Sequence, residues 1–208
     1  KLLCGNVEKK NDVEKLMGDQ RADMCFTDPP FDLEDNFSDN IFFAAKKDCP
    51  IFILDSETSI IPIIWKHYQF FKRLYAVNTK IPILINNKMP CSVMDYIAEF
   101  NQGKGKFRNL RDAFSNYLEC AKVRNANNKN NFGHSQAKNV FLPIQFITHF
   151  SDYNDLVIDF FGGSGSTLIA CEKTKRKCYM LEIEPIYCEM ICARWEQFTK
   201  SERVKIIC

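Results

Sequence analysis

The order of apolar and polar positions predicts an alternation of strands and helices along most of the chain. Short apolar runs bounded by turn residues are typical of buried strands, and they lie at 2–5, 22–26, 51–54, 74–78, 156–160 and 178–182. Helical periodicity or capping residues predict helices at 11–17, 38–47, 60–71, 92–100, 141–150, 166–174 and 186–198. This alternation predicts an α/β fold with a mostly parallel sheet.

A few of these predicted elements depend on particular residues or remain ambiguous. Pro62 fits the first turn of its predicted helix, where its missing N–H is not needed. Ser92 and Asp95 resemble a capping pair for a helix that runs through Phe100. The segment 113–123 is open between helix and strand. A last strand is predicted at 204–207.

Length and composition fit one globular domain. A chain of 208 residues can bury a full hydrophobic core, and 46% hydrophobic residues is an ordinary fraction for such a protein. No apolar stretch reaches the ~20 residues of a membrane span, and no signal peptide is evident, so no membrane partner is expected. The chain begins at Lys1 without a Met, which suggests a domain upstream.

The cysteines point to a reducing compartment. Ten cysteines occur without a secretory signal, and none forms a Cys-x-x-Cys pair, so no zinc ribbon or thioredoxin-type site is predicted. Their mostly apolar neighbours predict buried free thiols and a cytoplasmic location.

Charge is informative through its distribution. The formal net charge is only +2, yet residues 72–138 hold twelve Lys or Arg against four acids. A solvated face and a phosphate-binding surface both fit such a stretch.

A first candidate site follows the apolar run 22–26. The two prolines of Asp28-Pro29-Pro30-Phe31 end the strand and remove two backbone donors, so that the carbonyls beside them stay available. The corner presents one carboxylate, carbonyl acceptors and an aromatic ring. This set suits an exocyclic amino group on a flat base, although Asp-Pro also begins ordinary turns.

A second candidate site lies at 157–167, which reads as a strand, a glycine-rich turn and a helix start. Glycines allow a ligand to approach the carboxyl edge of the sheet, and the helix N-terminus offers N–H groups to a carboxylate. Glu182 ends the next strand, where an acid can accept both ribose hydroxyls. Because Leu168 replaces the third glycine of G-x-G-x-x-G, a methyl-donor site, a dinucleotide site and a plain core turn all remain open.

Together these motifs resemble the DNA amino-methyltransferases, which methylate adenine N6 or cytosine N4. Residues 28–31 look like their catalytic motif, 159–165 like their S-adenosylmethionine motif, and 178–185 like their acidic-strand motif. The order of the motifs is similar to that of the β group, a circular permutation of the common methyltransferase fold.

The resemblance implies a set of site residues. The catalytic residues would be Asp28, Pro29, Pro30 and Phe31. The cofactor-binding residues would be Asp159, Phe160, Phe161, Gly162, Gly163, Ser164, Gly165, Ser166, Glu182, Asn6, His134 and Lys138. The segment around His134 and Lys138 lacks both prolines of the family's His-Pro-Thr-Gln-Lys-Pro, and Asn6 replaces the family's Asp.

The resemblance also implies a fold and an activity. The fold would be a Rossmann-like, circularly permuted methyltransferase fold, with a mostly parallel twisted sheet, helices on both faces, and residues 86–138 as a target-recognition or insert segment. The activity would be S-adenosylmethionine-dependent methylation of adenine N6 in DNA without a metal, and a homodimer is a possible assembly. Asp28 favours adenine, because the cytosine-N4 enzymes more often have Ser there.

Other functions stay open at this point. They are cytosine-N4 methylation, a different methyl acceptor such as RNA, protein or a small molecule, and a catalytically silent DNA-binding subunit. Pro90-Cys91 matches the dipeptide of C5-cytosine enzymes, but its place in the chain does not.

Overall fold

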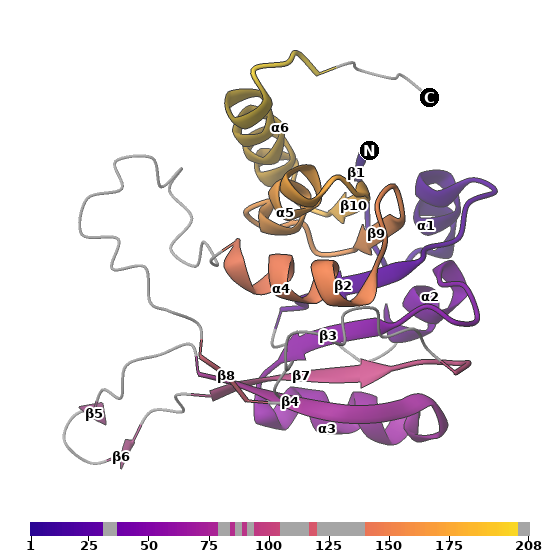
Figure 1. Cartoon of the computed structure of the whole chain (residues 1–208), viewed down its shortest axis with the longest axis vertical. Helices are drawn as coiled ribbons and strands as arrows, with labels where there is room; N and C mark the ends of the chain where they lie inside the picture. Colours follow the sequence, from indigo (N-terminus) through magenta and orange to yellow (C-terminus); the bar gives the residue numbers. More distant parts are fainter. Residues whose placement is uncertain are drawn as a thin grey trace.

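A mixed sheet of eight strands is the central element of the computed structural model, which describes residues 1–30, 37–78, 84–85, 89–90, 94–104, 117–119 and 140–203 (Figure 1). The strand order is β1-β10-β9-β2-β3-β7-β4-β8. Neighbouring strands are parallel, except that β7 runs antiparallel to both β3 and β4. The strands span Leu2–Cys4 (β1), Met24–Thr27 (β2), Ile51–Asp55 (β3), Phe71–Asn78 (β4), Met94–Phe100 (β7), Tyr117–Glu119 (β8), Leu156–Asp159 (β9) and Lys177–Glu182 (β10).

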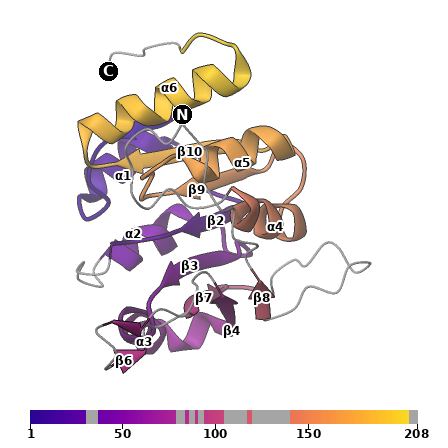
Figure 2. The ribbon, with the colours of Figure 1, turned by 90° about the vertical axis from the view of Figure 1, so that its left-hand side faces the viewer.

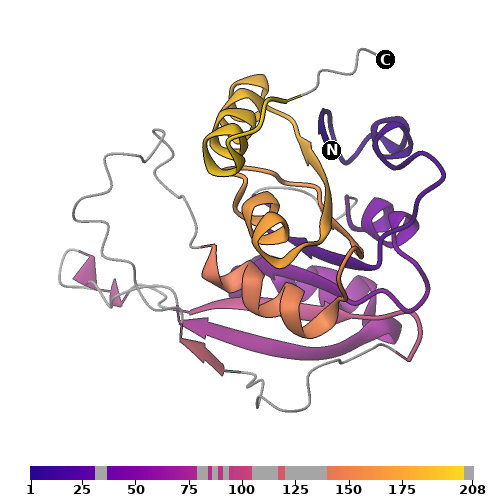
Figure 3. The same ribbon diagram turned by 45° about the horizontal axis from the view of Figure 1, so that its top comes forward.

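Helices cover both faces of this sheet (Figure 2). One layer holds α1 (Lys10–Met17), α2 (Phe37–Ala44) and α3 (Glu57–Lys66). The other holds α4 (Phe141–Phe150), α5 (Ser166–Thr174) and α6 (Pro185–Thr199), with α4 and α5 side by side (Figure 3). The short helix η1 (Tyr68–Phe70) precedes β4, and β5 (Leu84–Ile85) pairs with β6 (Met89–Pro90) in a small separate sheet.

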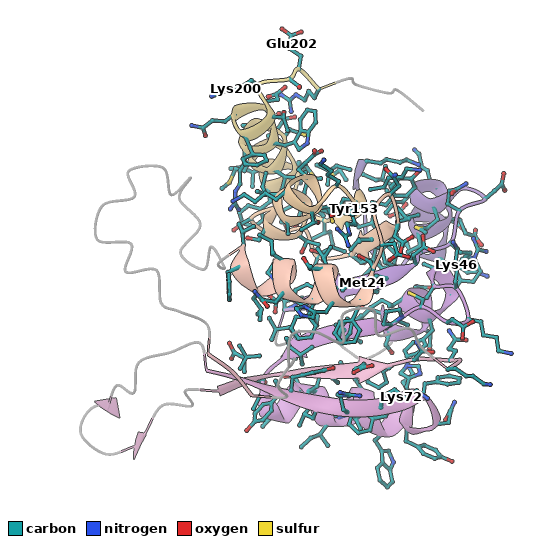
Figure 4. The ribbon with its side chains drawn as sticks, in the orientation of Figure 1. Met24, Lys46, Lys72, Tyr153, Lys200 and Glu202 are labelled. Carbon is teal, nitrogen blue, oxygen red and sulfur yellow. The ribbon has the colours of Figure 1, made fainter. Side chains whose placement is uncertain are left out.

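Alternation within the central strands explains the two layers. In β3, Ile51 and Ile53 face the core under α1 to α3, and Phe52 and Leu54 face the core under α4 to α6. Because helices bury both faces of the sheet, a strand such as β3 can be apolar at nearly every position. The fully buried Phe52 ring lies against α4, and truncating a buried Phe of this kind to Ala costs about 3–5 kcal/mol. Met24 of β2 belongs to the same layer and is labelled in Figure 4.

The helix predicted for 92–100 is wrong, because Met94–Phe100 form β7. Strand β7 lies between β3 and β4 and pairs with β4 from Met94 and with β3 from Tyr96, in both cases up to Phe100. Its side chains alternate, with Ile97 in one core and Ala98 in the other. Cross-strand pairing and burial on both faces therefore outweigh the local capping signal.

Pro62 also departs from its prediction. Helix α3 begins at Glu57, after Ser56 as N-cap, so Pro62 lies in the helix interior instead of the first turn. Its missing N–H cannot bond the Thr58 carbonyl in the usual helical pattern. The ambiguous segment 113–123 contains the strand β8, and the strand predicted at 204–207 lies outside the described residues.

Helices α4 and α5 have the predicted bounds. The helix predicted for 60–71 ends at Lys66 and is followed by η1 and β4, and the helix predicted for 38–47 ends at Ala44. Strands β7 and β8 lie within 86–138 and belong to the main sheet, while the role of that segment in target recognition stays a prediction. None of the helices within the described ranges is long and apolar enough to cross a membrane.

The topology creates a ligand position between β2 and β9. These strands are neighbours, yet the chain leaves β9 for α5 on one face and leaves β2 for α2 on the other. Open α/β sheets bind ligands at such a switch point, outside the carboxyl ends of the strands.

Candidate functional site

The two sequence motifs meet at the carboxyl ends of β2 and β9. Cys25 of β2 pairs with Ile158 of β9, and the strands are parallel. Asp28 and Phe161 each lie three residues beyond that pair, so both motifs leave the sheet at the same edge. Strands β10 and β1 end beside them, which brings Glu182 and Asn6 to this edge as well.

The Asp28-Pro29-Pro30 corner, predicted from the sequence to be catalytic, continues directly from β2. Asp28 is half-buried, Pro29 is buried and Pro30 is exposed. The negative charge of Asp28 contributes to raising the pKa of Asp159. Phe31 lies outside the described residues.

The glycine turn after β9 is tightly built. The Gly162 N–H donates to the Leu181 carbonyl at 2.8 Å, and the Gly165 N–H donates to the Gly162 carbonyl at 2.7 Å. Gly165 has φ +74°, a conformation that other residues rarely adopt. A Cβ on Gly162 would lie 2.9 Å from the Ile191 side chain. A side chain at position 162 would therefore have to displace Ile191 of α6, and the positive φ at position 165 favours glycine in the turn.

Glu182 fixes this turn from the neighbouring strand. Its Oε2 accepts the Gly163 N–H at 2.6 Å, and its Oε1 accepts the Glu184 N–H at 2.9 Å. The side chain is buried. Because each carboxylate oxygen can accept a second hydrogen bond, Glu182 keeps acceptor capacity for a ligand.

Asp159 is a buried acid of the site whose pKa is strongly raised. Its Oδ1 accepts the Thr27 hydroxyl at 2.9 Å and the Phe161 N–H at 3.1 Å. Burial, and to a smaller extent the charge of Asp28, raises the pKa of Asp159 from 3.8 to about 7, although hydrogen bonds from Thr167, Phe161 and Thr27 lower it. Near neutral pH, Asp159 therefore changes charge at the strand end.

This ionisation predicts a pH-dependent stability of the cofactor-free chain. The unfolded chain loses the Asp159 proton near pH 4, and the folded chain keeps it until about pH 7. The stabilisation is thus complete below pH 4 and is lost as the pH rises to 7, on the order of a few kcal/mol. Urea unfolding at pH 5 and pH 8 should show a larger loss for the wild type than for Asp159→Asn, which cannot ionise. Equal losses in the two proteins would contradict the raised pKa.

The N-terminus of α5 completes the turn. Gly165 is the N-cap and supplies no side-chain cap, and the hydroxyls of Ser164 and Ser166 lie 3.0 Å apart. Arg194 of α6 donates from Nη1 to the Ser164 carbonyl at 2.6 Å, and burial lowers its pKa. A helix N-terminus with a guanidinium beside it favours an anionic ligand group.

Several predicted site residues have other surroundings. Asn6 lies at the carboxyl edge of the sheet, as predicted, but its Oδ1 already accepts the Glu8 N–H at 2.9 Å. The Phe160 ring is buried in the core under α1 to α3, and Phe161 packs edge-to-face on Phe37 with ring centroids 5.2 Å apart. His134 and Lys138 lie outside the described residues.

Thr27, Thr167 and Arg194 contact this site but were not among the predicted site residues. Thr27 is a polar residue at the end of an apolar strand and directly precedes Asp28, so its position was a usable signal. Arg194 lies inside α6, and nothing in its local sequence indicates contact with the glycine turn.

Comparison with solved structures shows a shared fold. The complex of M1.HpyAVI with S-adenosylmethionine matches with a TM-score of 0.77 and 20% identity, covering 94% of this chain and 98% of that chain. The PvuII DNA methyltransferase, cytosine-N4-specific, matches with 0.78 and 18%, covering 96% and 90%. TTHA0409 of Thermus thermophilus, complexed with S-adenosyl-L-methionine, matches with 0.70 and 15%, covering 95% and 93%. The predicted Rossmann-like methyltransferase fold is thereby confirmed.

Sequence comparison shows the family. No curated protein sequence matches the chain. The profile of the DNA methylase family, which covers the N6 and N4 methyltransferases, matches residues 54–193. This range includes β9, the glycine turn, β10 and the first part of α6. The chain therefore belongs to the N6 and N4 DNA methylase family.

Proposed function

We propose that this chain transfers a methyl group from S-adenosylmethionine to the N6 amine of adenine in DNA. The observation that carries the proposal is the position of the Asp28-Pro29-Pro30 corner at the end of β2, beside the glycine turn that follows β9. A methyl acceptor at the corner and a methyl donor at the turn would lie on the same edge of the sheet.

The corner is suited to activating an aromatic amine. Such an amine is a poor nucleophile, because its lone pair is delocalised into the ring. The Asp28 carboxylate and a carbonyl of the two prolines can accept its hydrogens, which favours a pyramidal nitrogen with a localised lone pair. S-adenosylmethionine supplies an electrophilic methyl group on a sulfonium. Positioning and electrostatic stabilisation by the chain then provide most of the rate gain.

The turn is suited to the donor. Gly162–Gly165 leave room for close approach, Glu182 can accept ribose hydroxyls, and the N-terminus of α5 with Arg194 favours a carboxylate. M1.HpyAVI and TTHA0409, which share this fold, were solved in complex with S-adenosylmethionine. Both points support this cofactor for the chain.

The target base must leave the duplex to reach the corner. Extruding a base costs a few kcal/mol, and stacking on an aromatic ring such as Phe31 would offset part of that cost. Asp28 favours adenine over cytosine, by resemblance to the adenine enzymes of the family. Cytosine N4 is the second candidate, because the family includes cytosine-N4 enzymes and the fold matches that of the PvuII enzyme.

The proposal is tested by comparing acceptors. The purified chain would be titrated with S-adenosylmethionine by calorimetry and then given labelled donor with DNA duplex or RNA of the same sequence. Donor binding with transfer to DNA alone supports the proposal. Binding with transfer to RNA would change the substrate class, and binding without transfer would favour a silent DNA-binding subunit.

A further prediction concerns the affinity for DNA. We expect the basic segment 72–138 to contact DNA phosphates. Changing Lys104, Lys106, Arg108 and Arg111 to Ala should therefore weaken binding to DNA of any sequence. The slope of log K against log salt should flatten by up to about three to four, because each lost phosphate contact contributes about 0.9. Only Lys104 of these four lies in the described residues.

The matched control changes four exposed lysines at the opposite, amino-terminal edge of the sheet, namely Lys15, Lys173, Lys175 and Lys177. Fluorescence anisotropy over a salt series would compare both variants with the wild type. A salt slope that changes in the control and stays constant in the variant of residues 104–111 would contradict this prediction. That result would show that DNA binds elsewhere than at residues 72–138.

A further inference from the structure

Thr27 joins the two strands that carry the candidate site. It is the last residue of β2, and its side chain is fully buried. Its hydroxyl donates to Asp159 Oδ1 at 2.9 Å and accepts the Phe160 N–H at 3.2 Å. One hydroxyl therefore holds both the acid that ends β9 and the first amide beyond it.

This contact takes over where the backbone pairing ends. The β2–β9 ladder pairs Met24 with Val157 and Cys25 with Ile158. Beyond it, the Thr27 side chain accepts the Phe160 N–H in place of a backbone carbonyl. The strands can then diverge at the switch point while a buried hydrogen bond still connects them.

We propose that the Thr27 hydroxyl is a positioning group for methyl transfer, because it holds the Asp28 corner in a fixed place relative to the glycine turn. The inference rests on the proposed function. Asp28 is covalently next to Thr27, and the turn begins just after Phe160, so a change in this contact moves the acceptor site relative to the donor site. Thr27 acts through these neighbours and is not assigned a contact with either substrate.

In-line transfer is sensitive to such a shift. Misplacing reacting groups by about 1 Å costs about 10²-fold in rate, even when the substrates still bind. The donor itself is held mainly by the turn and by Glu182, which keep their own hydrogen bonds. The rate of transfer should therefore respond more than the affinity for the donor.

The contact also affects the ionisation of Asp159, which provides a second readout. The groups around this carboxyl are the Asp28 carboxylate, the Thr27 and Thr167 hydroxyls, the Phe161 N–H, and the buried thiols of Cys25 and Cys171. The hydrogen bond from Thr27 lowers the pKa of Asp159. Removing the hydroxyl should raise the pKa of Asp159. A loss of packing alone would not confine its effect on pKa values to this carboxyl.

The experiment uses single-turnover methylation of DNA with three variants. Thr27→Val keeps the shape and removes the hydroxyl, and it should lower the rate about 10²-fold while donor affinity changes less than tenfold. Thr27→Ser keeps the hydroxyl and should stay within about threefold of the wild type. Thr174→Val is the matched control, since it loses a hydroxyl bond to the Ala170 carbonyl at the far end of α5, and its rate should not change.

Carboxyl ¹³C NMR, with Asp159→Asn to assign the signal, should show a higher pKa of Asp159 in Thr27→Val and an unchanged one in Thr27→Ser. A wild-type rate together with an unchanged pKa in Thr27→Val would overturn the inference and leave the proposed function intact. If Thr27→Val does not fold, a loss above tenfold in folded Thr27→Ser would overturn it. A wild-type chain that methylates no DNA would overturn the proposed function and this inference with it.

Discussion

Replacing Asp28 with Ala is expected to abolish methyl transfer to DNA while leaving the affinity for S-adenosylmethionine nearly unchanged. The loss should exceed about 10⁴-fold, the upper end for removal of one well-placed catalytic group. The donor is expected to keep its affinity because its proposed contacts come from β9, β10 and α5. Single-turnover methylation and calorimetry on the same preparation would measure both quantities.

The chemistry of the substitution can be refined with Asp28→Asn. Asp28 is proposed to accept hydrogen bonds and not to remove a proton beforehand, because a carboxylate with a pKa near 4 is far too weak a base for a neutral aromatic amine. Asn keeps the shape and one carbonyl acceptor, so Asp28→Asn should retain activity about 10²–10⁴-fold below the wild type.

The control for this series is Asp19→Ala, which removes an exposed aspartate from the turn after α1. It should leave transfer and binding unchanged. If Asp28→Ala methylated DNA as fast as Asp19→Ala, the catalytic role of the whole corner would be lost.

Glu182→Ala carries the second large expected effect, a fall in donor affinity of at least tenfold and up to about 10³-fold. Hydrogen bonds to a charged acceptor contribute roughly 1.5–3 kcal/mol each. The variant removes the proposed bonds to the ribose, and it also removes the bonds that Glu182 receives from the N–H groups of Gly163 and Glu184. Calorimetry with S-adenosylhomocysteine and its 2′-deoxy analogue would separate these two contributions.

If Glu182 binds the ribose, the wild type should prefer the ribose compound and Glu182→Ala should bind both equally. Glu189→Ala is the matched control, because Glu189 is exposed on α6 and pairs with Arg203 at 2.7 Å. An unchanged affinity in a folded Glu182→Ala would remove this residue from the donor site.

Local sequence predicts the elements of this fold where the local signal and the tertiary surroundings agree. Helices α4 and α5 have their predicted bounds. Strand β7 was missed because its conformation depends on β3 and β4, which pair with it from both sides, while its own residues offered a capping signal. Pro62 was expected in the first turn because the helix was predicted to start at residue 60. The true start at Glu57 was missed because it is not marked by an apolar residue.

The neighbourhood of the two motifs could be predicted for a different reason. In a parallel sheet the carboxyl ends of the strands share an edge, so motifs that follow neighbouring strands must come together. The detailed contacts could not be predicted. Thr27 and Asp159 are 132 residues apart in sequence, and their bond depends on the register of β2 against β9. The bond of Glu182 to Gly163 likewise depends on β10 lying beside β9.

The most direct test of the proposed activity is the identity of the nucleoside that the chain methylates. DNA treated with the purified chain and S-adenosylmethionine would be digested to nucleosides and analysed by mass spectrometry, in parallel with DNA treated with Asp28→Ala. We predict N6-methyladenine with the wild type and no methylated nucleoside with the variant. N4-methylcytosine would contradict the choice of base, and 5-methylcytosine, no product, or the same product from both proteins would contradict the proposed mechanism itself.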